Sequence, residues 1–247
     1  MRLPPAVISA PLAAAIFFFP VVLFFGFLVL CLIECDYYWA LRDQEGIFEH
    51  IQAVFYLAAL LLGLISAKRP YQQRRMPVFW ILALFSVGAL FVLGEEIAWG
   101  QGLFGFTSPE FFQQRNQQGD MTLHNLRLVE SGKWHHKAFL LVGLYGAFAW
   151  LTTRNLPVSD TRQFLVPPWF LSLYFLPAAV WYGGNKTYIK WIGIPGNHQE
   201  TAELLLALGI FFLAACNLRR LSYASEPVHA PVPGHLPLAA SRPAPRH

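Results

Sequence analysis

The segment VFWILALFSVGALFVLGEEIAWGQ, Val78–Gln101, is a long apolar run that ends in two adjacent glutamates. No charged residue occurs between Val78 and Gly94, and as a helix this run would be roughly 25 Å long. That length approaches the hydrocarbon thickness of a bilayer, so Glu95 and Glu96 would lie near its edge. A helix C-terminus disfavours negative charge, and carboxylates in such a place usually have a partner. We therefore expect the pair to meet a proton, a cationic side chain or a metal ion.

The composition of the whole chain is typical of integral membrane proteins. Of its 247 residues, 55% are hydrophobic and only 13% are charged, and the mean hydropathy is +0.42. The net charge of +4 comes from Lys and Arg at the ends of apolar runs, which indicates membrane topology rather than nucleic-acid binding. Three cysteines without a CxxC pair predict neither a disulfide framework nor a cysteine metal site.

Six segments predict membrane-spanning helices, which need about 20 apolar residues each. They are Leu12–Ile33, Ile47–Ala67, Val78–Ala98, Ala138–Thr153, Phe164–Tyr182 and Thr201–Leu218. The fourth is short, and prolines interrupt the fifth. The first is too long for a signal peptide and no A-x-A cleavage site follows it, so we expect a retained helix. The predicted fold class is all-α, a polytopic transmembrane helix bundle of about six spanning helices.

The distribution of Lys and Arg predicts the orientation of the bundle. If the N-terminus is cytoplasmic, 11 of the 18 Lys and Arg lie on the cytoplasmic side and 7 on the outer side. We therefore expect a protein of the bacterial inner membrane with both termini cytoplasmic. Residues 1–224 are predicted to form one transmembrane domain, and residues 225–247, which include six Pro, a disordered tail.

The polar candidates for chemistry lie at the ends of different segments but on one side of the predicted membrane. They are Glu49, Glu95, Glu96, His124, His198 and Glu200. Glu49 and Glu200 have a capping alternative, because a helix N-terminus favours a carboxylate. His135 and His136, at the start of the fourth segment, are expected to be interfacial residues. The shared side does not depend on the absolute orientation of the protein.

The long outer loop, Gly102–Lys137, contains a predicted helix of its own. In the stretch TSPEFFQQRNQQ, Ser108 is expected as the N-cap and Pro109 at the first helical position. Its Phe and Gln residues predict a short interfacial helix, which would cover a site or meet lipid headgroups. The loop then returns His124 over the bundle.

Several stretches resemble a group of uncharacterised bacterial multi-pass membrane proteins. They are EGIFEHIQA, GEEIAWGQ, GFTSPEFF, NQQGDMTLHNL and NHQETAELLLAL, against a pattern of E-D-G-x-x-E, G-E-E-I-S-W-G-Q and N-x-Q-x-E-x-N-L-H-N. The likeness runs from about Arg42 to Leu208, with Ala98 in place of Ser, Asp120 in place of Glu and Thr122 in place of Asn. This resemblance implies membership of the group and no particular activity.

A fainter likeness links the paired glutamates to CAAX-type membrane proteases. That family carries E-E-x-x-x-R, but Gly100 stands at the Arg position, and Ala202 stands where Asn or Asp follows the later histidine. The stretch MTLH also departs from F-x-x-x-H. Only the chemical analogy remains, in which paired glutamates and a histidine within a membrane activate water.

The first functional hypothesis is a membrane enzyme. Its predicted metal ligands, for zinc or another divalent ion, are Glu95, Glu96, His124, His198 and Glu200. Its predicted catalytic residues are Glu49, Glu95, Glu96 and His124, with Glu49 as a general base or an orienting residue. The substrate would be a membrane lipid or a lipid-linked molecule, and the reaction a hydrolysis or group transfer.

Two further hypotheses stay open. A proton-coupled transporter would use intramembrane carboxylates, but here they lie at one end of the bundle and no inverted repeat is visible. A structural or assembly protein would hold the acidic cluster by ion pairs with Arg115, Arg127, Lys186 and Lys190. Convergence of carboxylates and histidines without Lys or Arg favours the enzyme, whereas salt bridges throughout favour the structural role.

Overall fold

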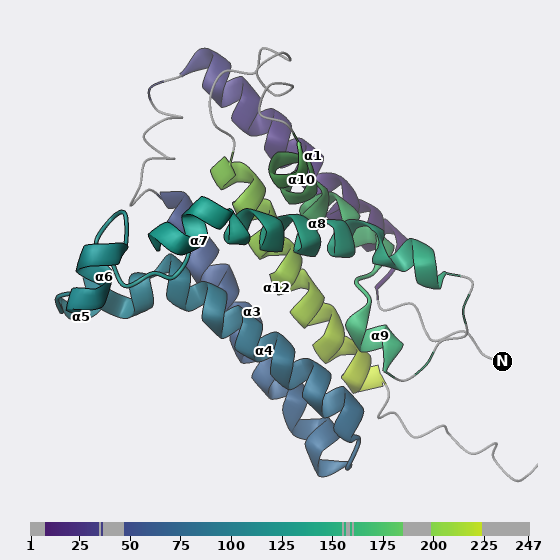
Figure 1. Cartoon of the computed structure of the whole chain (residues 1–247). Helices are drawn as coiled ribbons and strands as arrows, with labels where there is room; N and C mark the ends of the chain where they lie inside the picture. The colour runs from purple at the N-terminus through teal and green to yellow at the C-terminus, as the bar shows by residue number, and fades with distance from the viewer. Residues whose placement is uncertain are drawn as a thin grey trace, which may run out of the picture.

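The structure is a computed structural model that describes residues 8–34, 36, 47–154, 156, 159, 161–184 and 199–223. Every regular element in those ranges is a helix, so the all-α prediction is confirmed. The longer helices are α1 (Ala10–Ile33), α3 (Ile47–Gln72), α4 (Met76–Glu96), α8 (Trp134–Thr153), α10 (Ser172–Gly183) and α12 (Gln199–Tyr223) (Figure 1). The shorter ones are η1 (Ala98–Gly100), α5 (Gln101–Phe104), α6 (Glu110–Arg115), α7 (Arg127–Gly132), α9 (Arg162–Leu165) and η2 (Trp169–Leu171).

Five stretches of the described residues are long and apolar enough to cross a membrane: 10–30, 47–72, 76–96, 162–183 and 199–222. They match the first, second, third, fifth and sixth predicted segments, which confirms a multi-pass membrane protein. The predicted fourth segment is a helix of 20 residues, α8, but it is not among the five. Its first turn carries His135, His136 and Lys137, which leaves its apolar part short of about 20 residues.

Contacts at the start of α8 and in the later helix α9 lie near opposite ends of α12. The His136 ring at its start lies 5.1 Å from the ring of Tyr182, whose hydroxyl donates to Glu203 near the start of α12. After α8 the chain reaches α9, where the Asn217 side chain near the end of α12 donates to the Phe164 carbonyl. These two places are about 21 Å apart along α12. The chain therefore passes between the two ends of the bundle from α8 to α9, and Figure 1 shows α8 crossing α12.

Helix α12 is the centre of the bundle. Of its spanning window 72% is buried within the protein, compared with 11% for α1. Ala59, Ala89 and Ala214 bring α3, α4 and α12 together, since small residues let helices approach closely in a membrane. A similar approach joins α8 to α10, where a Cβ on Gly143 would come within 2.6 Å of the Ala179 backbone.

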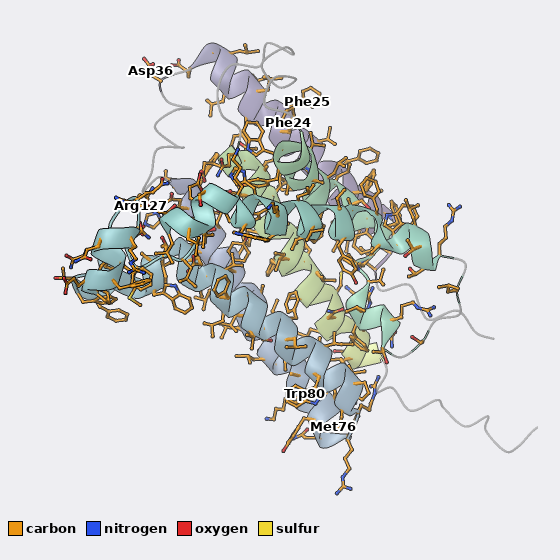
Figure 2. The ribbon with its side chains drawn as sticks, in the orientation of Figure 1. Phe24, Phe25, Asp36, Met76, Trp80 and Arg127 are labelled. Atoms are coloured by element: carbon orange, nitrogen blue, oxygen red, sulfur yellow. The ribbon has the colours of Figure 1, made fainter. Side chains whose placement is uncertain are left out.

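Apolar side chains cover the outside of the bundle. Val22, Leu64 and Leu84 on three different helices are each more than half exposed. A water-soluble protein rarely exposes so much apolar surface, whereas lipid tails would cover it. Figure 2 places Trp80 and Arg127 at opposite ends of the bundle. The end that carries Arg127 also carries the last turn of α4 and the helices α5, α6 and α7, as Figure 1 shows.

Candidate functional site

A left-handed turn follows α4 and brings the chain back to the last turn of that helix. Ala98, Trp99 and Gly100 have φ values of 45°, 53° and 85°. Left-handed backbone costs a non-glycine residue about 1–2 kcal/mol, so other contacts must hold the turn. The Trp99 indole lies against Gly94, where a Cβ would come within 2.8 Å of the ring, and its Nε1 donates to Glu95 at 2.8 Å.

The buried carboxylate of Glu95 also accepts hydrogen bonds from a loop distant in sequence. The amides of Leu123 and His124 donate to its Oε2 at 2.8 and 2.9 Å. The Nδ1 of His124 lies 3.0 Å from the same oxygen. Successive amides aimed at one carboxylate form an anion-binding nest. The partner expected for Glu95 is therefore a set of N–H donors together with a histidine.

Side-chain hydrogen bonds shape the loop Asn116–Leu126 so that its amides point at Glu95. The Asn116 amide group donates to the Thr122 carbonyl at 2.8 Å, and its Oδ1 accepts from the backbone of the intervening turn. Gln101 ties this loop to the segment after α4, because its Oε1 accepts from the Met121 amide at 3.0 Å. The segment after α4 and the loop Asn116–Leu126, which are distant in sequence, thus form one hydrogen-bonded unit.

The predicted interfacial helix is present as α6, Glu110–Arg115, but its predicted cap is wrong. Pro109 is the N-cap residue, and no side chain caps the helix. The Ser108 hydroxyl instead donates to Gln101 Oε1 at 2.8 Å, so tertiary bonding of the loop outweighs local capping.

Glu95 and His124 form an oriented pair that is accessible on the histidine side. The His124 side chain is 39% exposed, and that of Glu95 only 8%. Because a carboxylate only accepts, the proton of a neutral His124 ring lies on Nδ1 and Nε2 keeps its lone pair. Burial lowers the pKa of His124, but the hydrogen bond and charge of Glu95, helped by Asp120, outweigh it and hold that pKa above its ordinary value.

Two further histidine rings lie between His124 and α10. Its ring centroid lies 6.1 Å from that of His135, which lies 4.2 Å from that of His136. Burial and the neighbouring His136 lower the pKa of His135, although Glu130 lies 3.4 Å from its Nε2. The His136 ring lies 5.1 Å from the ring of Tyr182. The string of rings therefore connects the loop to the start of α12.

A buried polar group lies where α3, α4 and α12 meet. Gln52 and Tyr56 are fully buried on α3, and the Gln52 amide donates to Glu200 at 3.4 Å. The Tyr56 hydroxyl lies within electrostatic range of Glu96 and Glu203, and Glu203 exerts the strongest charge effect on Glu96. Neither the Tyr56 hydroxyl nor Gln52 Oε1 has a hydrogen-bond partner among the residues that the structure describes. Carboxylates from two helices thus face buried neutral oxygens.

The predicted site residues therefore separate into a pair in contact and a nearby acidic group. Glu95 and His124 touch, while Glu96 lies within electrostatic range of Glu49 and Glu200. His198, like the tail from Ser225, falls outside the described ranges. Within those ranges no group of three or more His, Cys, Asp or Glu side chains is placed to hold a metal ion. The predicted zinc or other divalent ion stays a prediction.

Several residues of this site were not singled out from the sequence. Trp99 follows the glutamates within the same motif, but its bond to Glu95 depends on a left-handed turn with no clear sequence signal. Tyr182 looked like part of an apolar helix, and its partner Glu203 like a residue near a helix start. His135 and His136 were expected at the interface, and their ring contacts join them to this site.

Two of the four basic residues in the structural hypothesis, Arg115 and Arg127, pair with no carboxylate among the residues described. Arg115 lies over the Phe111 ring at 4.9 Å. The carboxylates of Glu95 and Glu130 pair instead with His124 and His135. Lys186 and Lys190 fall in the range 185–198, which is not described.

Comparisons with protein-family models, curated proteins and solved structures find no match. The two resemblances noted in the sequence therefore stay predictions, and the chemistry must be argued from the residues themselves. The arrangement can hold a histidine in one orientation at the boundary of the bundle and can offer its Nε2 to a water or hydroxyl group.

Proposed function

We propose that the chain is a multi-pass membrane enzyme in which Glu95 orients His124 as a general base toward a lipid or lipid-linked substrate. The observation that carries this proposal is the 3.0 Å contact between Glu95 and His124, together with the exposed His124 ring. A carboxylate on Nδ1 fixes the ring and raises the basicity of Nε2, which then takes a proton from water or a hydroxyl group. The reaction class is hydrolysis or group transfer.

The place of the pair supports a lipid substrate. Glu95 stands at the end of a membrane-spanning stretch, so the pair lies at the membrane boundary. In the adjoining α5, Leu103 is 74% and Phe104 80% exposed, which suits a segment that dips into the headgroup region. By the bias of Lys and Arg, we place this end at the periplasmic face of a bacterial inner membrane, with both termini cytoplasmic.

A divalent metal such as zinc is compatible with this proposal but is not required by it. Glu96 and Glu200, with His198, are the candidates to hold such an ion beside the pair. A bound ion would lower the pKa of a coordinated water and so supply a nucleophile. His124 would still receive the proton, because Glu95 already holds its ring.

The proposal is tested by measuring whether the protein chemically converts lipids of the surrounding membrane. The protein would be reconstituted into nanodiscs made from a total bacterial membrane-lipid extract, and the lipids followed by mass spectrometry. We expect the wild type to convert one lipid class and His124→Gln to do so about 100-fold more slowly or less. Matching elution profiles and unfolding temperatures would show that both proteins are folded. Equal lipid profiles for the two would contradict the proposal.

A structural role is the second candidate, and the hydrogen bonding of Glu95 favours it. That carboxylate accepts from Trp99, Leu123 and His124, so it closes the loop onto the bundle whether or not His124 reacts. The two roles differ in one result: a purely structural pair predicts that Glu95→Gln loosens the loop while the lipids of wild type and variant stay identical.

A further inference from the structure

A cavity of about 420 Å³ opens between the start of α8 and the end of α10. Lys133, His136 and Lys137 line it on one side, and Trp181 and Tyr182 on the other. The two lysines are exposed and flank the first turn of α8, so two positive charges line this side of the cavity. Neither pairs with a carboxylate among the described residues.

The cavity lies beside the candidate site. On its α10 side, Tyr182 donates to Glu203, and on its α8 side the His136 ring lies 4.2 Å from the His135 ring. His135 in turn neighbours His124 at 6.1 Å. A molecule in the cavity would therefore be separated from the oriented His124 by the rings of His136 and His135, with a positive edge on the side of α8.

The region beside the cavity is apolar and faces outward. Leu140 lines the cavity, and the next residues along the exposed side of α8, Leu141 and Leu144, are 66% and 42% exposed. On α10, Val180 is 56% exposed. In a membrane this surface would contact acyl chains, so the cavity lies between a cationic end and a lipid-facing apolar surface.

We propose that this cavity binds the phosphate headgroup of a membrane lipid, with Lys133 and Lys137 on the phosphate and the acyl chains along α8. This inference names the substrate class of the enzyme proposed above and rests on that proposal for the lipid being a substrate. Two ammonium groups on one side match the charge of a phosphate, and the Trp181 side of the cavity suits the glycerol and first methylene groups. The Lys137 ammonium also lies 4.2 Å from the exposed Trp134 ring, a cation–π contact of about 0.5–1 kcal/mol that a charge-assisted bond to a phosphate exceeds.

The test compares two lipids that differ only in the phosphate. Dipalmitoyl phosphatidic acid and dipalmitoylglycerol have the same acyl chains, and each would be titrated into the detergent-purified protein and followed by native mass spectrometry. We expect phosphatidic acid to bind about tenfold more tightly or better, because a charge-assisted contact exceeds the free energy of a tenfold change. Equal binding of the two lipids would overturn the proposal.

Variants locate the binding. Lys133→Asn with Lys137→Gln removes both charges, and Asn tolerates the left-handed backbone at position 133, where φ is 48°. A matched control, Arg115→Gln with Arg127→Gln, removes two charges from the same end of the protein but outside the cavity. We expect the lysine pair to lose about tenfold or more in affinity for phosphatidic acid, and the arginine pair to keep wild-type affinity. Equal losses would show a general charge effect and contradict the site.

The binding readout also separates this inference from the proposed function. His124→Gln should bind phosphatidic acid as the wild type does, since His124 does not line the cavity. If it binds normally and no lipid is converted by either protein, the cavity is a lipid site and the enzyme proposal fails. If lipids are converted but the lysine variants bind and convert normally, the cavity assignment fails and the enzyme proposal stands.

Discussion

Replacing Glu95 with Gln keeps the shape of the side chain and removes its capacity to accept on both oxygens. In the wild type, Oε2 accepts from the amides of Leu123 and His124 and from His124 Nδ1, and Oε1 accepts from Trp99. In either orientation of the Gln amide, its NH₂ group would face N–H donors. The loop Asn116–Leu126 should therefore detach from the end of α4.

The size of the effect follows from these bonds. A hydrogen bond to a charged group contributes about 1.5–3 kcal/mol, and one to a neutral group about 1 kcal/mol. If the Gln oxygen takes the place of Oε2, the three bonds from Leu123 and His124 weaken by roughly 1 kcal/mol each, and if it takes the place of Oε1 they are lost. We expect loop closure to weaken by about 3 kcal/mol or more, which corresponds to a rise of more than 100-fold in the open population. When opening is fast relative to cleavage, the rate of proteolysis follows that population.

Trypsin gives a direct assay, because Arg115 and Arg127 flank the loop. Cleavage at either arginine would be timed by mass spectrometry of the protein in detergent, for the wild type and Glu95→Gln. The matched control is Glu110→Gln on α6, whose carboxylate accepts from the exposed Gln114 and from no other residue in the described ranges. We expect fast cleavage of Glu95→Gln and wild-type rates for the control. Protection of Glu95→Gln equal to that of the wild type would refute the reasoning about this carboxylate.

Three further predictions use other parts of the same unit. The pKa of His124 in the folded protein lies above its ordinary value of 6.5. Its pairing with Glu95 should therefore stabilise the loop fully below about pH 6.5. This contribution should be lost as the pH rises through the pKa of His124 in the folded protein. The trypsin assay across pH, with His124→Gln as a pH-independent reference, tests this sign. Gly94→Ala should destabilise the turn by about 1–3 kcal/mol, measured by thermal unfolding, because the new Cβ meets the Trp99 ring. In the control variant Gly88→Ala, on the same helix, the new Cβ meets no atom within 4 Å, so the stability should stay unchanged. Elemental mass spectrometry should find stoichiometric metal that is lost in His124→Ala if the predicted metal site exists, and metal absent from the wild type would contradict that site.

The spanning helices were predictable because hydropathy over about 20 residues is a local property. The segment that became α8 shows the limit of that signal. Its polar first turn, with His135, His136 and Lys137, weakens the hydropathy, although the helix starts beside Tyr182 and the chain then reaches α9 near the other end of α12.

The site was predictable in outline and not in detail. Topology alone placed Glu95 and His124 on one side of the protein, and the structure brings them into contact. The role of Trp99 depends on a left-handed turn, and that of Tyr182 on the packing of α10 against α12. Both depend on tertiary contacts, which no spacing in the sequence expresses. The cap expected at Ser108 failed for a related reason, because the Ser108 side chain is turned toward Gln101, to whose Oε1 its hydroxyl donates.

The measurement that tests the central claim most directly is the ¹⁵N NMR spectrum of histidine-labelled protein, with His124 assigned by the loss of its signals in His124→Gln. At a pH above the pKa of His124, the two ring nitrogens show which of them carries the proton. The account predicts a protonated Nδ1 bound to Glu95 and an unprotonated Nε2, with this preference lost in Glu95→Gln. A proton on Nε2 in the wild type, or a tautomer unchanged by Glu95→Gln, would contradict the claim that Glu95 prepares His124 as a base.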